Sequence, residues 1–173
     1  IATPGGAELA LPNFQIGDLM GGTQAAVAGV LAALLGAQRS GRGRFVDISM
    51  AHEVLRHHVL ATFSLQATGR TPPPGRDLLS GGAPCYGVYR TADGRHLAVG
   101  ALEPKFWEAL CATVGRPDWA AQHWSRGLVP GSAASMALRD QLAALLAAEP
   151  LAHWAARFEA VDACVTPVLR LDE

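Results

Sequence analysis

The chain has 173 residues, of which half are hydrophobic, and its formal net charge is −1 at pH 7. This length suits one domain or two small ones, and the apolar fraction is sufficient for a folded core. The near-neutral charge argues against nucleic acid or an anionic membrane as a general partner.

Cysteine usage, apolar runs and the first residue give three further expectations. The three cysteines are odd in number and lack Cys-x-x-Cys spacing, which is typical of reduced residues in a cytoplasmic protein. Glycines interrupt the longest apolar stretch before it reaches the roughly 18 residues of a membrane span, so we expect no membrane partner. Because the sequence begins with Ile1 rather than Met, we expect it to be a piece of a longer protein.

The N-terminal part predicts a loop followed by a long helix. The loop over residues 1–16 contains helix breakers, namely Pro4, Gly5, Gly6 and Pro12. An alanine-rich helix is then expected over about 19–39, and its apolar residues lie nearly all round it, which predicts burial on every side. A Ser-Gly-Arg-Gly run ends this helix.

Asp18 stands where this helix begins, and its position supports two interpretations. Aspartate is a preferred N-cap residue, because its carboxylate accepts bonds from the unpaired N–H groups of the first turn. Alternatively, Asp18 is a catalytic carboxylate, since helix N-termini also stabilise developing negative charge. Gly21 and Gly22 follow and leave the backbone without side chains, which would let a substrate approach closely.

The middle of the chain predicts a strand, a helix and a linker. Residues 44–48 are expected to form a short strand, after which Ser49 caps a helix over about 50–67. The three histidines on this helix lack the i,i+4 spacing of a metal pair, so no metal site is predicted. Three consecutive prolines within residues 67–82 predict an extended linker and a domain boundary.

The part after the linker predicts a small α+β domain over residues 83–173. An Asp-Gly turn at Asp93 is a strong hairpin signal between two short strands. Pro104 suits the first position of the helix that follows. The expected elements are strands at 84–90, 95–100 and 164–169 and helices at 104–114, 133–148 and 150–160.

Two residues of this second part, Glu103 and Tyr86, are candidate site residues. Glu103 comes directly before the helix at Pro104, where an acid complements the positive end of the helix dipole. Tyr86 lies in the first strand, where a buried aromatic is the ordinary structural interpretation. Residue type and position alone therefore assign both side chains a structural role.

Several motifs, in order along most of the chain, resemble one known family. The first is Gly-Asp-Leu-Met-Gly-Gly at the start of the long helix, and the others are spaced through both parts of the sequence. They occupy residues 17–22, 40–49, 81–89, 92–95, 99–107 and 162–168. Together they resemble the class III CoA-transferases (CaiB/BaiF family), and within that family most of all the α-methylacyl-CoA racemases.

The resemblance implies an isomerase of fatty acid metabolism that acts on 2-methyl-branched acyl-CoA. Asp18 would exchange the α-proton on one face of an enolate, and Glu103 would support the family's catalytic histidine, which the resemblance places upstream of Ile1. Tyr86 matches a position near the acyl-CoA, and the backbone at Gly21 and Gly22 would help to stabilise the enolate oxygen. Coenzyme A would enter as part of the substrate, with no metal or redox cofactor.

The resemblance also implies a fold and an assembly. We expect a mixed α/β chain in which residues 1–66 are part of a large family domain and residues 83–173 form the small domain. Family members are interlocked homodimers with active sites between one subunit's large domain and the other's small domain. Two alternatives stay open: a CoA-transferase in which Asp18 is the nucleophile, and a non-catalytic fragment.

Overall fold

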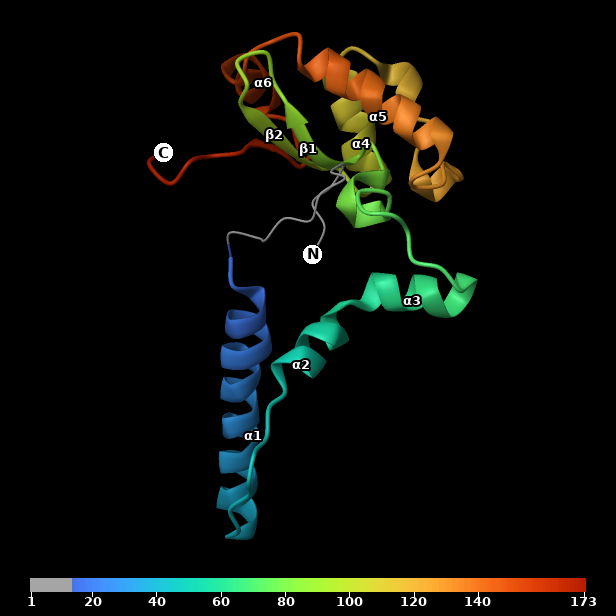
Figure 1. Ribbon diagram of the computed structural model, residues 1–173. Helices are drawn as coiled ribbons and strands as arrows, with labels where there is room; N and C mark the ends of the chain where they lie inside the picture. Colours follow the sequence, from blue (N-terminus) through green and yellow to red (C-terminus); the bar gives the residue numbers. More distant parts are fainter. Residues whose placement is uncertain (1–13) are drawn as a thin grey trace. The chain divides into compact units, whose positions relative to one another are not determined.

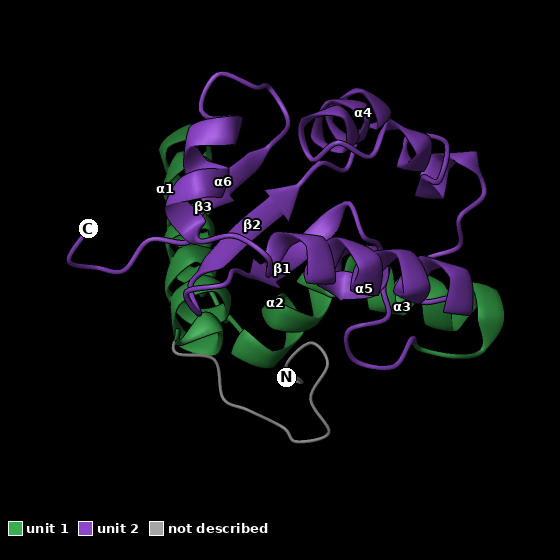
Figure 2. Cartoon of the chain, turned by 90° about the horizontal axis from the view of Figure 1, so that it is seen from above, with its two compact units in different colours: residues 1, 9–71 green, residues 2–8, 72–173 purple. Residues whose placement is uncertain are grey.

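The computed structural model describes residues 14–173, so the loop breakers from Pro4 to Pro12 lie outside the described residues. The described chain forms two compact units, which divide between Thr71 and Pro72 and are coloured separately in Figure 2. Unit 1 is helical, and unit 2 contains both helices and a sheet. The chain therefore has the mixed helix-and-sheet class expected from the sequence.

Unit 1 is helical. It consists of a π-helical segment η1 (Gly17–Gln24) continued by α1 (Ala25–Ser40), then α2 (Met50–His57) and α3 (Val59–Thr68). Gly41 ends α1 in the left-handed conformation, with φ of 67°, and its N–H donates to the Ala37 carbonyl as expected for a glycine C-cap. The predicted long helix is therefore present, with its first turns widened into π geometry.

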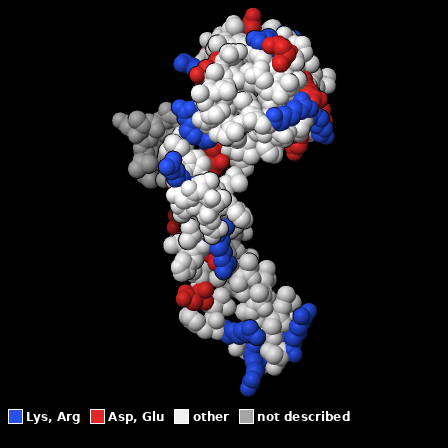
Figure 3. Space-filling model, turned by 90° about the vertical axis from the view of Figure 1, so that its right-hand side faces the viewer, with Lys and Arg blue, Asp and Glu red and all other residues white. Residues whose placement is uncertain are grey.

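The expected burial of this helix is not observed. α1 has no buried residue, and Leu31, Leu34 and Leu35 are each more than half exposed. By length and composition alone, Gly17–Ser40 is apolar enough to cross a membrane, a property that core helices of soluble proteins share. Figure 3 shows uncharged surface between small, separate groups of charged side chains.

The segment after α1 runs back along the helix in Figure 1 and does not form a strand. A Cβ placed on Gly29 would lie 3.0 Å from Val46 and 3.1 Å from Ile48, so the segment packs closely on α1 at this glycine. The prediction of a strand at residues 44–48 is wrong, because the described segment contacts a helix rather than another strand.

The second predicted helix is present but divided. The Ser49 side chain accepts a bond from the His52 N–H at 3.4 Å, which confirms the predicted cap. At His58 the backbone leaves helical geometry, with ψ of 44°, and α3 then starts at Val59. Gly69 ends α3 in the left-handed conformation.

Unit 2 is built on a three-stranded antiparallel sheet in the order β1-β2-β3. Its strands are β1 (Tyr86–Arg90), β2 (His96–Gly100) and β3 (Val165–Pro167). β1 and β2 form the predicted hairpin, with Tyr86 opposite Gly100 and Val88 opposite Ala98. Gly94 has φ of 77°, the conformation that favours glycine in this turn.

Helices and helical turns complete unit 2 and enclose its core. They are η2 (Leu78–Gly82), α4 (Pro104–Thr113), η3 (Pro117–Trp119), η4 (Trp124–Arg126), α5 (Ala133–Leu146) and α6 (Leu151–Phe158). The helices bury Trp107, Leu142 and Trp154 against the inner face of the sheet, where Tyr89 and Leu97 are almost fully buried. The three helices and the last strand confirm the elements predicted for residues 104–169.

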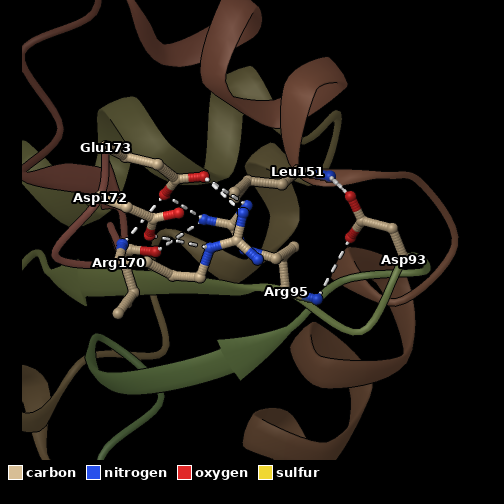
Figure 4. Close-up of polar contacts among 7 residues, drawn as sticks. Asp93, Arg95, Leu151, Arg170, Asp172 and Glu173 are labelled. Carbon is tan, nitrogen blue, oxygen red and sulfur yellow. Dashed lines mark hydrogen bonds and ion pairs between the residues drawn. The ribbon is translucent and has the colours of Figure 1, made fainter.

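The C-terminal segment is held to the hairpin by an ion pair, shown in Figure 4. Both terminal nitrogens of Arg95 donate to the Glu173 carboxylate, at 2.9 and 2.7 Å. Asp93 accepts the Leu151 N–H at 3.1 Å and so joins the hairpin turn to the start of α6. These contacts connect segments that lie 78 and 58 residues apart in the sequence.

Candidate functional site

Asp18 lies on the surface, in the first turn of η1. Ile16 rather than Asp18 occupies the N-cap position, and no side chain caps this end of the helix, so the N-cap interpretation is wrong. The Asp18 main-chain carbonyl accepts the Thr23 hydroxyl at 3.0 Å. The exposed carboxylate is therefore placed to complement the helix dipole or to meet a ligand.

The two glycines after Asp18 are packing positions. A Cβ on Gly21 would lie 2.8 Å from the Met50 carbonyl oxygen and 2.9 Å from Val54, so glycine is needed where η1 meets α2. A Cβ on Gly22 would approach the flexible Met50 side chain at 3.1 Å. The close approach that these glycines permit within the described residues is thus made by α2.

Tyr86 lines a cavity of about 660 Å³ in unit 2. The side chain is half-buried, so it is a strand aromatic that also faces an open space. Leu79 and Gly81 of η2 contribute to the wall, as do Val88 of β1 and Arg139 of α5. A volume of this size lies within the range of small-molecule sites.

The η2 turn forms the rim of this cavity and is firmly anchored. Asp77 accepts the Leu78 N–H at 2.7 Å, and its own N–H donates to the Ser80 hydroxyl at 3.2 Å. The Gly82 carbonyl accepts the buried Ser135 hydroxyl at 2.7 Å. The last five residues of the expected linker therefore form an ordered turn of unit 2, and residues 79–81 of it line the cavity.

Glu103 occupies the N-cap position of α4, with an extended backbone and an exposed side chain. Its carboxylate makes no capping bond, whereas its carbonyl accepts the Trp107 N–H at 3.1 Å. The Trp124 indole donates to the Leu102 carbonyl at 2.8 Å and so holds the preceding residue. The main chain at Glu103 is thus fixed on both sides, with its carboxylate at the surface.

Two polar side chains that the sequence did not single out lie in unit 2 with a buried nitrogen and no hydrogen-bond partner among the described residues. They are Arg139, at Nε, and His123, at Nε2. The Nδ1 atom of His123 lies 2.8 Å from the Ser125 hydroxyl, and burial lowers the pKa of this imidazole. No spacing or motif in the sequence marks either residue.

Two of the three thiols are buried and unreactive, whereas Cys164 is exposed and lines the same cavity as Tyr86. Burial raises the pKa of Cys85 to about 11 and that of Cys111 to about 12, so both are neutral thiols near pH 7. Within residues 14–173, no three His, Cys, Asp or Glu side chains are grouped as metal ligands would be. The candidate site therefore offers carboxylates, a tyrosine and backbone groups, and the cavity wall adds Arg139, His96 and the Cys164 thiol.

The structure brings the predicted residues together in two sets. Asp18, Gly21 and Gly22 share η1 in unit 1, while Tyr86 and Glu103 belong to unit 2. Within unit 2, Tyr86 lines the cavity and Glu103 does not. The arrangement offers an exposed carboxylate at a helix start in one unit, and a cavity with one cationic side chain in the other.

Comparison with known proteins identifies the class to which this chain belongs. The sequence model of CoA-transferase family III matches residues 2–173. The chain therefore belongs to CoA-transferase family III, a family that includes both racemases and CoA-transferases.

Individual relatives agree with this assignment. The α-methylacyl-CoA racemases of Homo sapiens and Mus musculus are 33% and 35% identical to the chain over 94% of its length. The succinyl-CoA:mesaconate CoA-transferase of Haloarcula marismortui is 30% identical over 76% of the chain. The chain spans 41% of each racemase and 31% of that transferase.

Solved structures give the same fold. A crystal structure of a mutant of Rv3272 from Mycobacterium tuberculosis superimposes with a TM-score of 0.71 at 22% sequence identity. The match covers 99% of this chain and 43% of that protein. The mixed helix-and-sheet architecture is thus the one found in crystal structures of this kind.

Proposed function

We propose that this protein is an acyl-CoA racemase that acts on 2-methyl-branched acyl-CoA by 1,1-proton transfer. The observation that carries the proposal is the 33–35% identity to two α-methylacyl-CoA racemases along 94% of the chain. The matched region includes Asp18 in the first turn of a helix, where a carboxylate is exposed and can meet a ligand.

The proposed reaction proceeds through an enolate. The thioester acidifies the α-carbon, a base removes the α-proton, and a conjugate acid returns a proton to the opposite face. Asp18 serves one face, and a histidine outside these 173 residues serves the other. The α-carbon loses one proton and gains one, so the reaction needs neither a metal nor a redox cofactor, and coenzyme A is present only as part of the substrate.

Residues of unit 2 have supporting roles in this proposal. Glu103 is a positioning residue that accepts a bond from the catalytic histidine, a task suited to its exposed carboxylate and fixed main chain. Tyr86 lies along the path of the acyl group, because it lines a cavity large enough for a small molecule. The η1 backbone at Gly21 and Gly22 contributes to stabilising the enolate oxygen.

The assembly and location are also proposals. The exposed leucines of α1 present an apolar surface of the kind that marks an interaction site. A homodimer in which each active site combines one subunit's large domain with the other's small domain would cover such a surface. We place this dimer in the cytoplasm, in agreement with the free state of the three cysteines.

CoA transfer is the second candidate function, favoured by the match to the succinyl-CoA:mesaconate CoA-transferase. In that reaction Asp18 attacks the acyl thioester, forms an acyl anhydride and releases the CoA thiolate. The thiolate then attacks the aspartyl carbonyl of the anhydride, which releases the donor acid as its carboxylate and leaves an aspartyl-CoA thioester. The acceptor carboxylate attacks this thioester, forms a second anhydride and releases the CoA thiolate, and attack of the thiolate on the acceptor carbonyl gives the new acyl-CoA and frees the Asp18 carboxylate. The two functions thus assign different chemistry to the same carboxylate.

The test measures α-hydrogen exchange from a 2-methylacyl-CoA in deuterated water, with the full-length protein that contains this chain. Loss of a general base typically costs about 10²-fold or more in rate, so Asp18→Asn should lower racemisation, and α-proton exchange on the face that Asp18 serves, by at least that factor, while the histidine can still exchange the proton on the opposite face. Asp47→Asn is a matched control, because Asp47 is another exposed aspartate of unit 1. An enzyme without exchange, but with a hydroxylamine-trappable acyl group in the presence of a carboxylate acceptor, would replace the racemase proposal by the transferase.

A further inference from the structure

Arg139 is a cation in the wall of the cavity in unit 2. It comes from α5, and its guanidinium carbon lies 5.6 Å from the centre of the buried Tyr89 ring. Its Nε atom is buried and has no hydrogen-bond partner among the described residues. A guanidinium has five N–H donors and cannot lose its charge in a protein, so an unpartnered buried N–H is costly.

Two glycines leave space beside this guanidinium. A Cβ on Gly81 would lie 3.6 Å from Nη2 of Arg139, and a Cβ on Gly87 would lie 3.9 Å from the same atom. Gly81 also has φ of 107°, a conformation that other residues rarely adopt. The chain therefore places the guanidinium beside two positions that carry no side chain and that both line the cavity.

Among the described residues, no aspartate or glutamate lines the cavity. Its wall combines apolar residues such as Leu79, Val88 and Ala98 with the polar side chains of Ser80, His96, Cys164 and Thr166. A partly apolar space with one permanently charged cation at its wall suits an elongated apolar ligand with one anionic end. A carboxylate matches the planar fork of a guanidinium and can accept two parallel N–H bonds.

We propose that this cavity binds an acyl group whose far end carries a carboxylate, and that Arg139 binds this carboxylate. The inference rests on the proposed function, because it names the substrate class of an acyl-CoA enzyme. A phosphate of coenzyme A is the other source of negative charge. Arg139 is the one permanently charged side chain among the described residues that line the cavity, which favours the single charge of a carboxylate over the several charges of the CoA phosphates.

The test compares two thioesters of N-acetylcysteamine that have the same shape. The glutaryl thioester ends in a carboxylate, whereas the 5-methylhexanoyl thioester ends in two methyl groups at the same positions. Each is titrated into the 173-residue chain and followed by amide shifts in nitrogen–proton NMR spectra. Since a hydrogen bond to a charged group is strong, the glutaryl thioester should bind at least about tenfold more tightly and shift the Gly81 and Gly87 amides.

Variants assign the preference to Arg139. Arg139→Gln should remove the glutaryl preference, and Arg139→Lys, which keeps the charge but loses the fork, should retain part of it. Arg90→Gln is the matched control, because Arg90 is an exposed cation of β1 that does not line the cavity. Equal affinity for the two thioesters, no binding of either, or a preference that survives Arg139→Gln would each overturn the proposal.

A third ligand separates the two sources of negative charge. Adenosine 3′,5′-bisphosphate carries phosphates of coenzyme A without an acyl group. We expect it to leave the cavity amides unchanged, and binding that Arg139→Gln weakens would assign Arg139 to phosphate and overturn the carboxylate proposal. Because these titrations measure binding without turnover, they can fail while Asp18-dependent proton exchange is observed, and the reverse can also occur.

Discussion

The two units differ in what they bury. Unit 2 has a continuous core that includes three tryptophans from α4, η3 and α6. Within the described residues of unit 1, Gly21 alone is buried, and the apolar side chains of α1 to α3 are partly or largely exposed. Unit 2 is therefore stabilised by its own hydrophobic core, whereas the apolar side chains of unit 1 stay largely in contact with water.

This difference has a consequence for the candidate site. Hydrophobic burial is worth roughly 25 cal/mol for each Å² of apolar surface removed from water, so exposed leucines on α1 contribute little to stability here. The neighbouring helices α2 and α3 have 8 and 10 residues, and isolated helices shorter than about 12–15 residues are marginal in water. Asp18 is thus carried by elements that need another surface to cover them, while Tyr86 and Arg139 lie on a unit with its own core.

The largest expected effect comes from the same substitution in the two units. Leu142 in α5 is fully buried, so Leu142→Ala should lower the free energy of unfolding by about 2–5 kcal/mol. Leu34 in α1 is 56% exposed, so Leu34→Ala should change the free energy of unfolding by less than about 0.5 kcal/mol. Urea unfolding is followed by tryptophan fluorescence for Leu142→Ala, because all four tryptophans belong to unit 2, and by helical circular dichroism for Leu34→Ala. Equal costs of the two substitutions would contradict the comparison.

A smaller effect is expected at the contact between η1 and α2. Gly21→Ala forces a Cβ against the Met50 carbonyl, and overpacking of this kind costs about 1–3 kcal/mol. Gly22→Ala is the matched control, because its Cβ meets only the movable end of the Met50 side chain. The midpoint temperature of thermal unfolding, followed by helical circular dichroism, should fall for Gly21→Ala alone. Equal midpoint temperatures of the two variants would show that the packing at Gly21 is unimportant.

The smallest expected effect is a pH dependence in unit 2. The hydrogen bonds from Arg95 hold the pKa of Glu173 at about 2, below its ordinary value of 4.5. Because the folded pKa is lowered, this stabilisation is fully present above pH 4.5 and is lost as the pH falls towards 2. Glu173→Gln should therefore lower the urea midpoint at neutral pH, and its deficit should shrink over that acidic range.

Glu159→Gln is the control for this titration. Glu159 is exposed, and no ion pair of it is found among the described residues. Its midpoint should follow that of the unmodified chain at each pH. If the lowered urea midpoint of Glu173→Gln stayed equally low down to about pH 2, the ionised Glu173 carboxylate would not be what stabilises the fold through Arg95.

Local signals in the sequence predicted the elements whose causes are local. The Asp93-Gly94 turn identified the hairpin, Ser49 identified a helix start, and Pro104 identified another. In each case the responsible side chain or backbone acts within a few residues. The family was likewise recognisable, because its motifs follow one another along most of the chain.

Features that depend on distant partners could not be predicted. Residues 44–48 have the composition of a strand, but a strand needs an adjacent strand, and this segment packs on α1 instead. The helix break at His58 involves no proline or glycine, so no helix-breaking residue in the sequence predicts it. Arg139 acquires its setting only when α5 meets the glycines of η2 and β1, a result of packing between distant segments.

Backbone amide hydrogen exchange on the 173-residue chain tests the contrast between the units most directly. Amides in α5, such as that of Leu142, should exchange only through global unfolding of unit 2, because this helix is packed on the core. Amides in α1, such as that of Leu34, should exchange with the small protection of an isolated helix. Equal protection of α1 and α5 would contradict the account, since it would show that unit 1 is stabilised as strongly as unit 2.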